Sequence, residues 1–390
     1  MTYRHHWTLD PSITFLNHGS FGATPKAVLE VQSAIRAQME HEPVRFFARD
    51  LEPLLDAARE AVASFVGADP AGFAFVPNAT AGVNAVLRSL DLDEHDELLV
   101  TTHEYQASRN ALDFVAAQSG AKVVVADVPF PLDSADEVVQ SVLAKVTDRT
   151  RLLLVDHVTS QTALVMPIER LIAELNARGI DTLVDGAHAP GYLPLQLESL
   201  GAAYYTGNLH KWPCAPKGAA FLYVRRNRRA TVRPISISHG ASSERVDRSR
   251  FHIEFDWTGT LDPSAYLAAP EAIRFVGSLV PGGWPEVMAR NRSLALEARD
   301  LLCSTLGIEQ PAPDDMLGAM AAVPLPDGQE SEAAMLYGDA LQDCLLFDER
   351  IEVPVIPWPA PPKRLLRISA HLHNEPADYQ RLADALRKLL

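Results

Sequence analysis

The sequence predicts an α/β protein whose mainly parallel β-sheet carries helices on both faces. Two observations lead to this prediction. Between residues 97 and 188, short apolar runs alternate with segments of helical periodicity, which is the order of elements that builds a parallel sheet. The chain also has 390 residues, of which 47% are hydrophobic and 22% charged, so it can bury a large core and is long enough for two domains.

The first strand of this alternation is expected at residues 97–102, where ELLVTT is a short apolar run. A helix is expected at 106–120, because its apolar residues follow helical spacing and a glycine ends the segment. The β-branched run AKVVVADV at 121–128 predicts a buried strand, and the spacing at 135–146 predicts the helix that follows it.

Further along the chain, TRLLLVDHV at 150–158 predicts a strand, and IERLIAELNARG at 168–179 predicts a helix that ends at a glycine. The run DTLVDGAH at 181–188 predicts the next strand. Ligands of parallel sheets bind beyond the carboxyl ends of the strands. The polar residues that follow these strands are therefore the candidates for a site.

Three parts of the chain are expected. Residues 1–45 hold no complete strand–helix unit and are expected to form an N-terminal arm that packs with the smaller domain. Residues 46–274 are expected to form a large domain around the sheet. From residue 275 long helical stretches and short strands replace the alternation, so residues 275–390 are expected to form a smaller C-terminal domain.

Charge and cysteine content exclude several classes of protein. The net charge of −15 argues against nucleic acid as a partner, because phosphate binding needs a basic surface. Cys214, Cys303 and Cys344 form no CxxC pair, so neither a disulfide framework nor a zinc knuckle is expected. The N-terminus lacks the apolar region of a signal peptide, and no apolar run is long enough for a membrane span. We therefore expect a cytoplasmic protein without a membrane partner.

Lys211 and Asp185 together suggest a cofactor. A lysine that forms a Schiff base must lose its proton near neutral pH, which burial and neighbouring positive charge favour; His210 and Trp212 flank Lys211. Asp185 ends an apolar strand, where an acid is costly without a partner. The protonated ring nitrogen of pyridoxal phosphate (PLP) is such a partner. Taken singly, each residue also fits an ordinary role, as a surface lysine and a turn aspartate.

A strand that runs into Asn78, Ala79 and Thr80, followed by a helix, could hold a phosphate at the helix N-terminus. Ordinary helix capping by Asn78 or Thr80 is the alternative. The glycine-rich loops of nucleotide-binding proteins do not occur in the sequence, which argues against a nicotinamide-dependent oxidoreductase.

The segment THEYQAS at 102–108 follows another strand. Tyr105 could stack on an aromatic cofactor ring, and His103 could be a base, a ligand or a capping residue. A zinc site made of His103, His157 and His188 is disfavoured, because their spacing matches no paired-ligand pattern. No metal site is therefore expected.

Nine segments in this order resemble the class V aminotransferase family of fold-type I PLP enzymes, and within it the isopenicillin N epimerase-like branch. They are FLNHGSFGATP (15–25), PVRFFARD (43–50), NATAGVNAVL (78–87), HEYQA (103–107), DHVTSQTA (156–163), VDGAHAPG (184–191), NLHKWPCAPKG (208–218), WTGTLDPSA (257–265) and LLRISAHLHNEPADY (365–379). The resemblance implies a fold-type I PLP-dependent transferase fold, with a mainly parallel seven-stranded sheet in the large domain and a smaller α+β C-terminal domain.

The resemblance also implies roles for residues around the cofactor. Lys211 would form the Schiff base with PLP, and Asp185 would pair with the pyridine nitrogen. His188 would bond the phenolic oxygen of the ring together with Ser160, and Tyr105 would stack on the ring. The phosphate would be held by residues of two segments, 78–87 and 208–218. They are Asn78, Ala79, Thr80, Asn208 and His210.

Substrate and subunit contacts follow from the same resemblance. Arg367 would anchor the α-carboxylate of the substrate, for which a guanidinium fork is suited. Asn17, His18 and Arg45 would line the mouth of the substrate site. Thr260 would reach the phosphate in the neighbouring subunit, which implies a homodimer with active sites shared across the interface.

The implied activity is a PLP-dependent reaction at Cα of a small amino-acid substrate, with epimerisation or racemisation as the first choice. Epimerisation needs a proton donor on the face opposite Lys211, for which Tyr105, His18 or a water molecule are candidates. A carbon–sulfur β-lyase or a class V aminotransferase is the alternative. A persulfide-forming cysteine desulfurase is not expected, because the segment before Arg367 holds no cysteine, and Cys344 lies in an apolar, helix-like stretch. A purely regulatory module is also disfavoured, because the lysine is present and no DNA-binding segment is added.

Overall fold

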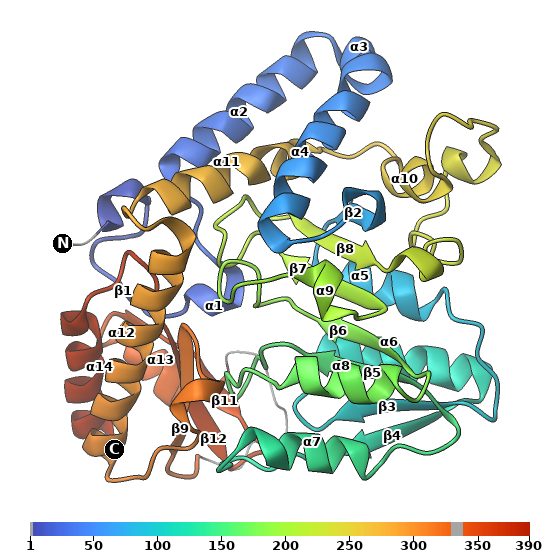
Figure 1. Cartoon of the computed structure of the whole chain (residues 1–390). Helices are drawn as coiled ribbons and strands as arrows, with labels where there is room; N and C mark the ends of the chain where they lie inside the picture. Colours follow the sequence, from blue (N-terminus) through green and yellow to red (C-terminus); the bar gives the residue numbers. More distant parts are fainter. Residues whose placement is uncertain (1–2, 329–337) are drawn as a thin grey trace.

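The computed structural model describes residues 3–328 and 338–390, and in this part of the chain a seven-stranded sheet forms the centre (Figure 1). Its order is β2-β8-β7-β6-β5-β3-β4, and β8 alone runs against the other six strands. The strands are β2 (Phe73–Val76), β3 (Glu97–Thr101), β4 (Lys122–Ala126), β5 (Thr150–Asp156), β6 (Asp181–Asp185), β7 (Tyr204–Asn208) and β8 (Ala220–Val224). The predicted α/β class and mainly parallel seven-stranded sheet are confirmed.

Helices cover both faces of this sheet. Successive side chains of a strand point to opposite faces. In β3, Leu98 and Val100 pack with the helices α5 (Ala79–Leu87) and α6 (Gln106–Ser119). Leu99 packs on the other face, in the same apolar cluster as α4 (Leu51–Val66), α7 (Ala135–Leu143) and α8 (Ile168–Asn176). The apolar runs of the sequence are therefore strands buried on both sides, as the alternation predicts.

The C-terminal part of the chain builds a second, smaller sheet. Its order is β11 (Val355–Pro357), β12 (Arg364–Ser369) and β9 (Met320–Leu325), all antiparallel. The helices α12 (Gly283–Leu306), α13 (Ala340–Phe347) and α14 (Pro376–Leu389) accompany it (Figure 1). The helix α11 (Ser264–Ser278) runs through residue 275, so the expected division into 46–274 and 275–390 falls inside a helix and stays a prediction.

The N-terminal residues contact two regions that lie far away in the sequence. The short strand β1 (Thr14–Phe15) pairs in parallel with β10 (Ile351–Glu352). The helix α1 (His18–Phe21) follows, and α2 (Lys26–His41) packs along α11 before α3 (Pro43–Arg45) begins (Figure 1). The expected arm at 1–45 stays a prediction, but its residues do reach β10 in the C-terminal part.

Short elements complete the description. They are α9 (Leu197–Leu200), α10 (Arg250–Phe255), the π-helical turn η2 (Phe46–Asp50) and the 3₁₀ turns η1 (Arg4–His6), η3 (Pro70–Gly72), η4 (Arg226–Arg228), η5 (His239–Ser242) and η6 (Asp314–Met316). Of the helices that the structure describes, none combines the length and the apolar character that crossing a bilayer requires.

Candidate active site

The candidate site lies at the edge of the large sheet where the parallel strands end. Asp156 ends β5 and Asp185 ends β6, and the two residues are register partners on neighbouring parallel strands. Paired residues of this kind project to the same face of a sheet. Asn208 ends β7, the next strand, and the loop after it carries Lys211. The topology therefore brings the predicted lysine and aspartate to one place.

Lys211 is held by a chain of side-chain hydrogen bonds. Its Nζ lies 3.0 Å from Nε2 of His188, and the indole Nε1 of Trp212 donates to Nδ1 of the same histidine at 3.4 Å. Because indole nitrogen is only a donor, Nδ1 of His188 is the acceptor, and a neutral His188 carries its proton on Nε2. That proton is donated to the lone pair of Lys211, which requires the amine to be neutral.

The electrostatic surroundings agree with a neutral amine. Loss of water around the amine, helped by the nearby charge of Arg367, lowers the pKa of Lys211 to about 7, although Asp185 and Asp156 act in the opposite direction. Burial, with the charges of Lys211 and Arg367, holds the pKa of His188 well below its ordinary value. A lysine with such a pKa can serve as a base or a nucleophile near neutral pH.

The backbone of Lys211 is also supported by the N-terminal segment. Nε2 of His18 lies 3.1 Å from the carbonyl oxygen of Lys211. Gly22 has a φ of 69°, and a Cβ there would lie 2.2 Å from the carbonyl oxygen of His210. A side chain at position 22 would therefore push the loop of Lys211 away, so glycine is required by both conformation and close approach.

Asp185 is 1% exposed and each of its oxygens accepts a hydrogen bond. The hydroxyl of Ser108 donates to Oδ2 at 2.7 Å, and the backbone N–H of Ala187 donates to Oδ1 at 3.0 Å. Burial raises the pKa of Asp185, while these two donors and the charge of Lys211 lower it. The carboxylate is thus fixed in orientation and close enough to Lys211 to affect its charge.

Two further buried acids adjoin Asp185. Glu104, which follows β3, and Asp156 are 6% and 3% exposed, and one oxygen of each lies within 4.8 Å of the others and of Asp185. Burial and the neighbouring carboxyls raise the pKa values of Glu104 and Asp156 well above their ordinary range. The sequence analysis does not predict a role for these two acids.

Arg367 on β12 joins the C-terminal sheet to this site. Its guanidinium bonds the backbone oxygen of Ser160 and lies 3.3 Å from the hydroxyl of Ser160, 2.8 Å from Ser20 and 3.4 Å from Oδ1 of Asn17. Asn17 in turn donates to Glu352 at 3.1 Å. Arg367, Asn17 and Ser160 are therefore brought together, and Ser160 bonds Arg367.

The N-terminus of α5 is capped by side chains. Asn78 accepts the N–H of Ala81 at 2.8 Å, which is ordinary helix capping, and Oδ1 of Asn208 accepts the N–H of Ala79 at 2.8 Å. His210 donates its Nδ1 proton to the carbonyl of Ala219 at 2.9 Å. Asn208 thus connects the end of β7 to the start of α5, the two places where phosphate contacts are expected. Its Oδ1 already accepts the backbone N–H of Ala79, one of the donors at this helix N-terminus.

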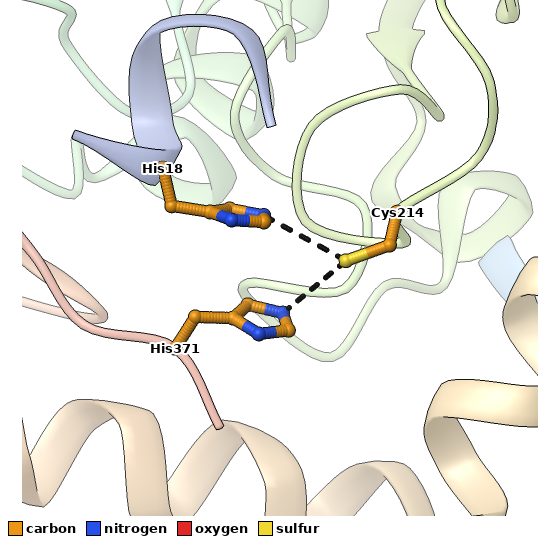
Figure 2. A group of neighbouring side chains, drawn as sticks. All are labelled: His18, Cys214 and His371. Carbon is orange, nitrogen blue, oxygen red and sulfur yellow. Dashed lines mark hydrogen bonds between the residues drawn. The ribbon is translucent and has the colours of Figure 1, made fainter. Parts of the chain in front are cut away.

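Figure 2 shows His18, Cys214 and His371, whose polar atoms converge in a buried group. The sulfur of Cys214 lies 3.7 Å from Nε2 of His18 and 3.5 Å from Nε2 of His371, and the two rings are stacked at 4.2 Å. Nε2 of His371 also lies 3.4 Å from the carbonyl oxygen of Trp212. Backbone carbonyls thus accept from Nε2 of both rings, so these two nitrogens carry protons and have no lone pair to offer a metal ion. The arrangement is that of a packing and hydrogen-bonding group.

His18 does not lie at an open mouth. Its ring is fully buried, and Nδ1 lies 3.1 Å from Nε2 of His373. With both nitrogens engaged, His18 is positioned to support the loop of Lys211 instead of facing a substrate. The expectation that it lines the substrate mouth is corrected on this ground, and His18 is no longer a candidate proton donor.

Three predicted residues are exposed in the single chain. Arg45 pairs with Glu42 and Asp50 at the surface, Thr260 is exposed, and Tyr105 is 40% exposed at the start of α6. Gly259 and Leu261, on either side of Thr260, line a groove of about 460 Å³, which Pro77 and Ala81 at the N-terminus of α5 also line. Arg45 and Thr260 are not brought to Lys211 within one chain.

Sequence alone gives no role to Ser108, Asp156 or Glu104, and it identifies Trp212 only as a neighbour of Lys211, not as a donor to His188. For Asp156 a signal existed, because it ends an apolar strand just as Asp185 does. Ser108 carries no such signal. Only the packing of α6 against the sheet brings it to an acid 77 positions further along the chain.

The three histidines weighed as a zinc site have separate partners. His103 bonds Thr162 and the carbonyl of Val128, and His157 lies 2.8 Å from the hydroxyl of Tyr205, whereas His188 bonds Lys211. Among the described residues, the groups that could hold a metal are the histidine–cysteine group of Figure 2 and the three acids, and neither includes these three histidines.

Known proteins with similar sequences support a single family. The family model described as aminotransferase class-V matches residues 22–343. The isopenicillin N epimerase of Amycolatopsis lactamdurans is 38% identical over 98% of this chain and 96% of its own length. That of Streptomyces clavuligerus is 36% identical over 97% and 95%. A probable chloroplastic L-cysteine desulfhydrase of Arabidopsis thaliana is 31% identical over 100% of this chain and 84% of its own.

Solved structures show the same fold. A mutant of C-DES with glycine covalently linked to its PLP cofactor matches with a TM-score of 0.81, at 22% identity and over 99% of both chains. A cysteine desulfurase from Escherichia coli matches with a TM-score of 0.78, at 22% identity and over 99% of this chain and 97% of its own. At this identity the structures show the fold alone. The match of the family model over most of the chain, together with the full-length similarity to the two epimerases, shows that the chain belongs to the class V aminotransferase family.

Proposed function

We propose that this chain is a PLP-dependent epimerase or racemase that removes the Cα proton of a small amino-acid substrate and returns a proton on the opposite face. The observation that carries the proposal is the amine of Lys211, whose pKa is lowered to about 7 and whose Nζ lies 3.0 Å from Nε2 of His188, beside the buried carboxyl of Asp185. The similarity to two isopenicillin N epimerases over nearly the whole chain supports the same reaction class.

The residues present fit PLP. A lysine of lowered pKa, a buried acid held by two donors and the N-terminus of α5 correspond to the aldehyde, the ring nitrogen and the phosphate of this cofactor. We propose that Lys211 binds it covalently, that Asp185 pairs with the ring nitrogen, and that His188 and Tyr105 contact the ring. The phosphate would lie against the Asn78–Thr80 turn, with the hydroxyl of Thr80 and the amide of Asn208 as donors.

His210 can take part only in one protonation state. Its Nδ1 proton is used by the carbonyl of Ala219, so Nε2 can donate to a phosphate only in the imidazolium form. Burial and the charge of Lys211 lower the pKa of His210 to about 4, whereas a phosphate dianion would favour the charged ring. His210 is therefore expected to gain a proton when the phosphate binds.

The chain's own groups account for the movement of the proton. When bound, PLP supplies an electron sink for the charge left at Cα. Lys211 accepts the proton at Nζ, because its pKa is lowered to about 7 and a substantial fraction of the amine is therefore unprotonated near neutral pH. His188 holds Nζ in place through Nε2, and Arg367 would hold the substrate carboxylate with its guanidinium. With His18 engaged elsewhere, Tyr105 or a water molecule is the candidate donor on the other face.

A carbon–sulfur β-lyase is the second candidate, because an L-cysteine desulfhydrase is 31% identical over the whole chain. It would use the same first step, followed by loss of a sulfur leaving group from Cβ. A persulfide-forming desulfurase is not proposed. The three cysteines lie at 214, 303 and 344, none of them in the segment between α13 and Arg367, and Cys214 is buried against His18 and His371.

A substrate screen in deuterated water tests the choice. Deuterium at Cα with inverted configuration is expected for an epimerase. Pyruvate and ammonia from a cysteine substrate would indicate the lyase, and a requirement for a keto acid would indicate an aminotransferase. Retention of the Cα hydrogen with every amino acid tried would contradict the proposed chemistry.

We expect Arg367→Ala to raise KM for the amino-acid substrate by about 10- to 100-fold, the effect of losing a charged hydrogen-bonding partner. The visible absorption of bound PLP should change little. Arg364→Ala is the matched control: it lies on the same strand, but its guanidinium pairs with Asp339 at 2.8 Å. Arg364→Ala should lower stability without raising KM. An unchanged KM in Arg367→Ala would remove Arg367 from the substrate site.

We also propose a cytoplasmic homodimer with shared active sites. The support is geometric: Thr260 and Arg45 are exposed in the single chain, and the groove beside residues 258–263 reaches the residues that flank the α5 N-terminus. A second chain seated there would bring its own Thr260 to the phosphate. The molar mass in solution, measured by light scattering, tests this directly, and a monomer with full activity would contradict it.

A further inference from the structure

Three carboxyl groups meet beneath the candidate cofactor site. Asp156 and Asp185 end neighbouring strands in register, and Glu104 follows β3, the strand on the other side of β5. One oxygen from each residue lies within 4.8 Å of the other two. All three side chains are at least nine-tenths buried, with exposures of 6%, 3% and 1% for Glu104, Asp156 and Asp185.

The three carboxyl groups differ in the number of hydrogen bonds that they accept. Asp185 accepts from Ser108 and from the backbone of Ala187. By contrast, both carboxyl oxygens of Glu104 and Oδ2 of Asp156 have no hydrogen-bond partner within the described chain. An ionised carboxylate without donors is costly in such surroundings, and a protonated carboxyl is the form that has a hydrogen to donate to a neighbouring oxygen.

The positive charges that face the group are too few to balance three anions. Lys211 acts on Asp156 and Asp185, and Arg109 acts on Glu104. Arg109 is already paired with Asp113, at 2.9 Å on the surface of α6. The nearby backbone N–H of Tyr105 lowers the pKa values of Glu104 and Asp156, but burial and the neighbouring carboxyls outweigh it. Carboxylates this close to one another cannot all ionise, so the protons belong to the group as a whole.

We propose that Glu104 and Asp156 are held as neutral carboxylic acids at neutral pH, and that they act as positioning residues that leave Asp185 the single ionised acid of the group. This inference rests on the proposed function, in which Asp185 pairs with the ring nitrogen of PLP. As neutral acids, Glu104 and Asp156 place no like charge beside the Asp185 carboxylate, which Ser108 and the backbone N–H of Ala187 hold in one orientation. They also prevent two additional negative charges from raising the pKa of Lys211, the base of the reaction. Burial and the neighbouring acids raise the pKa values of Glu104 and Asp156, which favours their neutral forms.

The proposal predicts the direction in which the stability of the folded protein changes with pH. A carboxyl whose pKa is raised in the folded state holds a proton that the unfolded chain releases, so its contribution is present at acidic pH and is lost as pH rises. Glu104→Gln and Asp156→Asn replace each acid with a neutral group of the same shape. The variants and the unmodified protein are measured in the PLP-loaded form. The Tm of each variant minus the Tm of the unmodified protein should increase by about 2–4 °C between about pH 5 and pH 9.

Glu97→Gln is the matched control. Glu97 begins β3 and is 2% exposed, but it accepts from Thr147 and Arg149 at 2.6 Å each, and these donors lower its pKa. Its contribution is present above the ordinary carboxyl range and is lost as pH falls. Glu97→Gln should therefore lose Tm relative to the unmodified protein as pH rises up to about pH 5, the ordinary carboxyl range, and the difference should stay constant between about pH 5 and pH 9, unlike that of Glu104→Gln.

Infrared spectroscopy gives a second readout that needs neither activity nor a variant that folds well. The unmodified protein at about pH 7 should show the carbonyl stretch of a protonated carboxyl, since other acids are ionised there. The band should weaken in Glu104→Gln and in Asp156→Asn. Absence of the band from the unmodified protein, or Tm curves of both variants that run parallel to its curve, would overturn the proposal. Failure of the proposed function would appear separately, as an unmodified protein that shows no PLP absorption.

Discussion

Replacing Lys211 with alanine is expected to remove the visible absorption band of covalently bound PLP and to lower turnover by about 1,000-fold or more, the scale of a lost base. The physical reason is that Lys211 is the group in the site with a lone pair available near neutral pH. Its pKa is lowered to about 7, and the hydrogen bond from His188 points at its amine. Absorption spectra of the purified proteins, followed by single-turnover assays with the substrate found by screening, measure both effects.

Lys217→Ala is the control for this experiment. Lys217 lies in the same segment, but its amine donates to the carbonyl oxygen of Gly22 at 2.9 Å and lies 3.5 Å from the hydroxyl of Thr24. These contacts tie the segment to the residues after α1, so the variant should be less stable yet keep the absorption band. Loss of the band in Lys217→Ala with retention in Lys211→Ala would show that the wrong lysine has been assigned.

The arrangement of the large domain could be predicted from the sequence because its signals are local. The runs around β3, β5 and β6 are apolar at successive positions, which indicates strands buried on both faces, and the intervening helices have a different period. The consequence that matters for function follows from topology: parallel strands end at one edge, so the acid that ends β6 and the loop after β7 had to lie near each other.

The rest of the site depends on contacts between distant segments, which no local pattern encodes. The ring of His18 is turned inward by two partners that are 193 and 355 positions away in the sequence. Its Nε2 donates to the carbonyl oxygen of Lys211, and its Nδ1 accepts from Nε2 of His373. Ser108 becomes part of the site only through the packing of α6. Thr260 is a different case, since its expected partner is a phosphate in a second chain, and a sequence can identify such a residue only by resemblance.

Asp185→Asn is expected to lower kcat by about 100-fold or more while leaving covalent PLP binding to Lys211 in place. The carboxylate offers two acceptor oxygens, which Ser108 and Ala187 use at 2.7 and 3.0 Å, and a negative charge. The amide keeps one acceptor and has no charge, so a protonated ring nitrogen loses its partner. A lost charge-assisted hydrogen bond of about 3 kcal/mol corresponds to this factor. The measurement is the rate of Cα hydrogen exchange in deuterated water, compared with the visible spectrum of the same sample.

Ser108→Ala separates the charge of Asp185 from its orientation. This variant keeps the charge of the carboxylate and the donor at Ala187 but removes the uncharged hydroxyl that donates to Oδ2, so the exchange rate should fall by about tenfold or less. If charge is the main contribution, Asp185→Asn is much slower than Ser108→Ala. If the two variants are equally slow, orientation alone explains the effect. An exchange rate of Asp185→Asn within about threefold of the unmodified protein, less than the contribution of one hydrogen bond, would exclude Asp185 as the partner of the ring nitrogen.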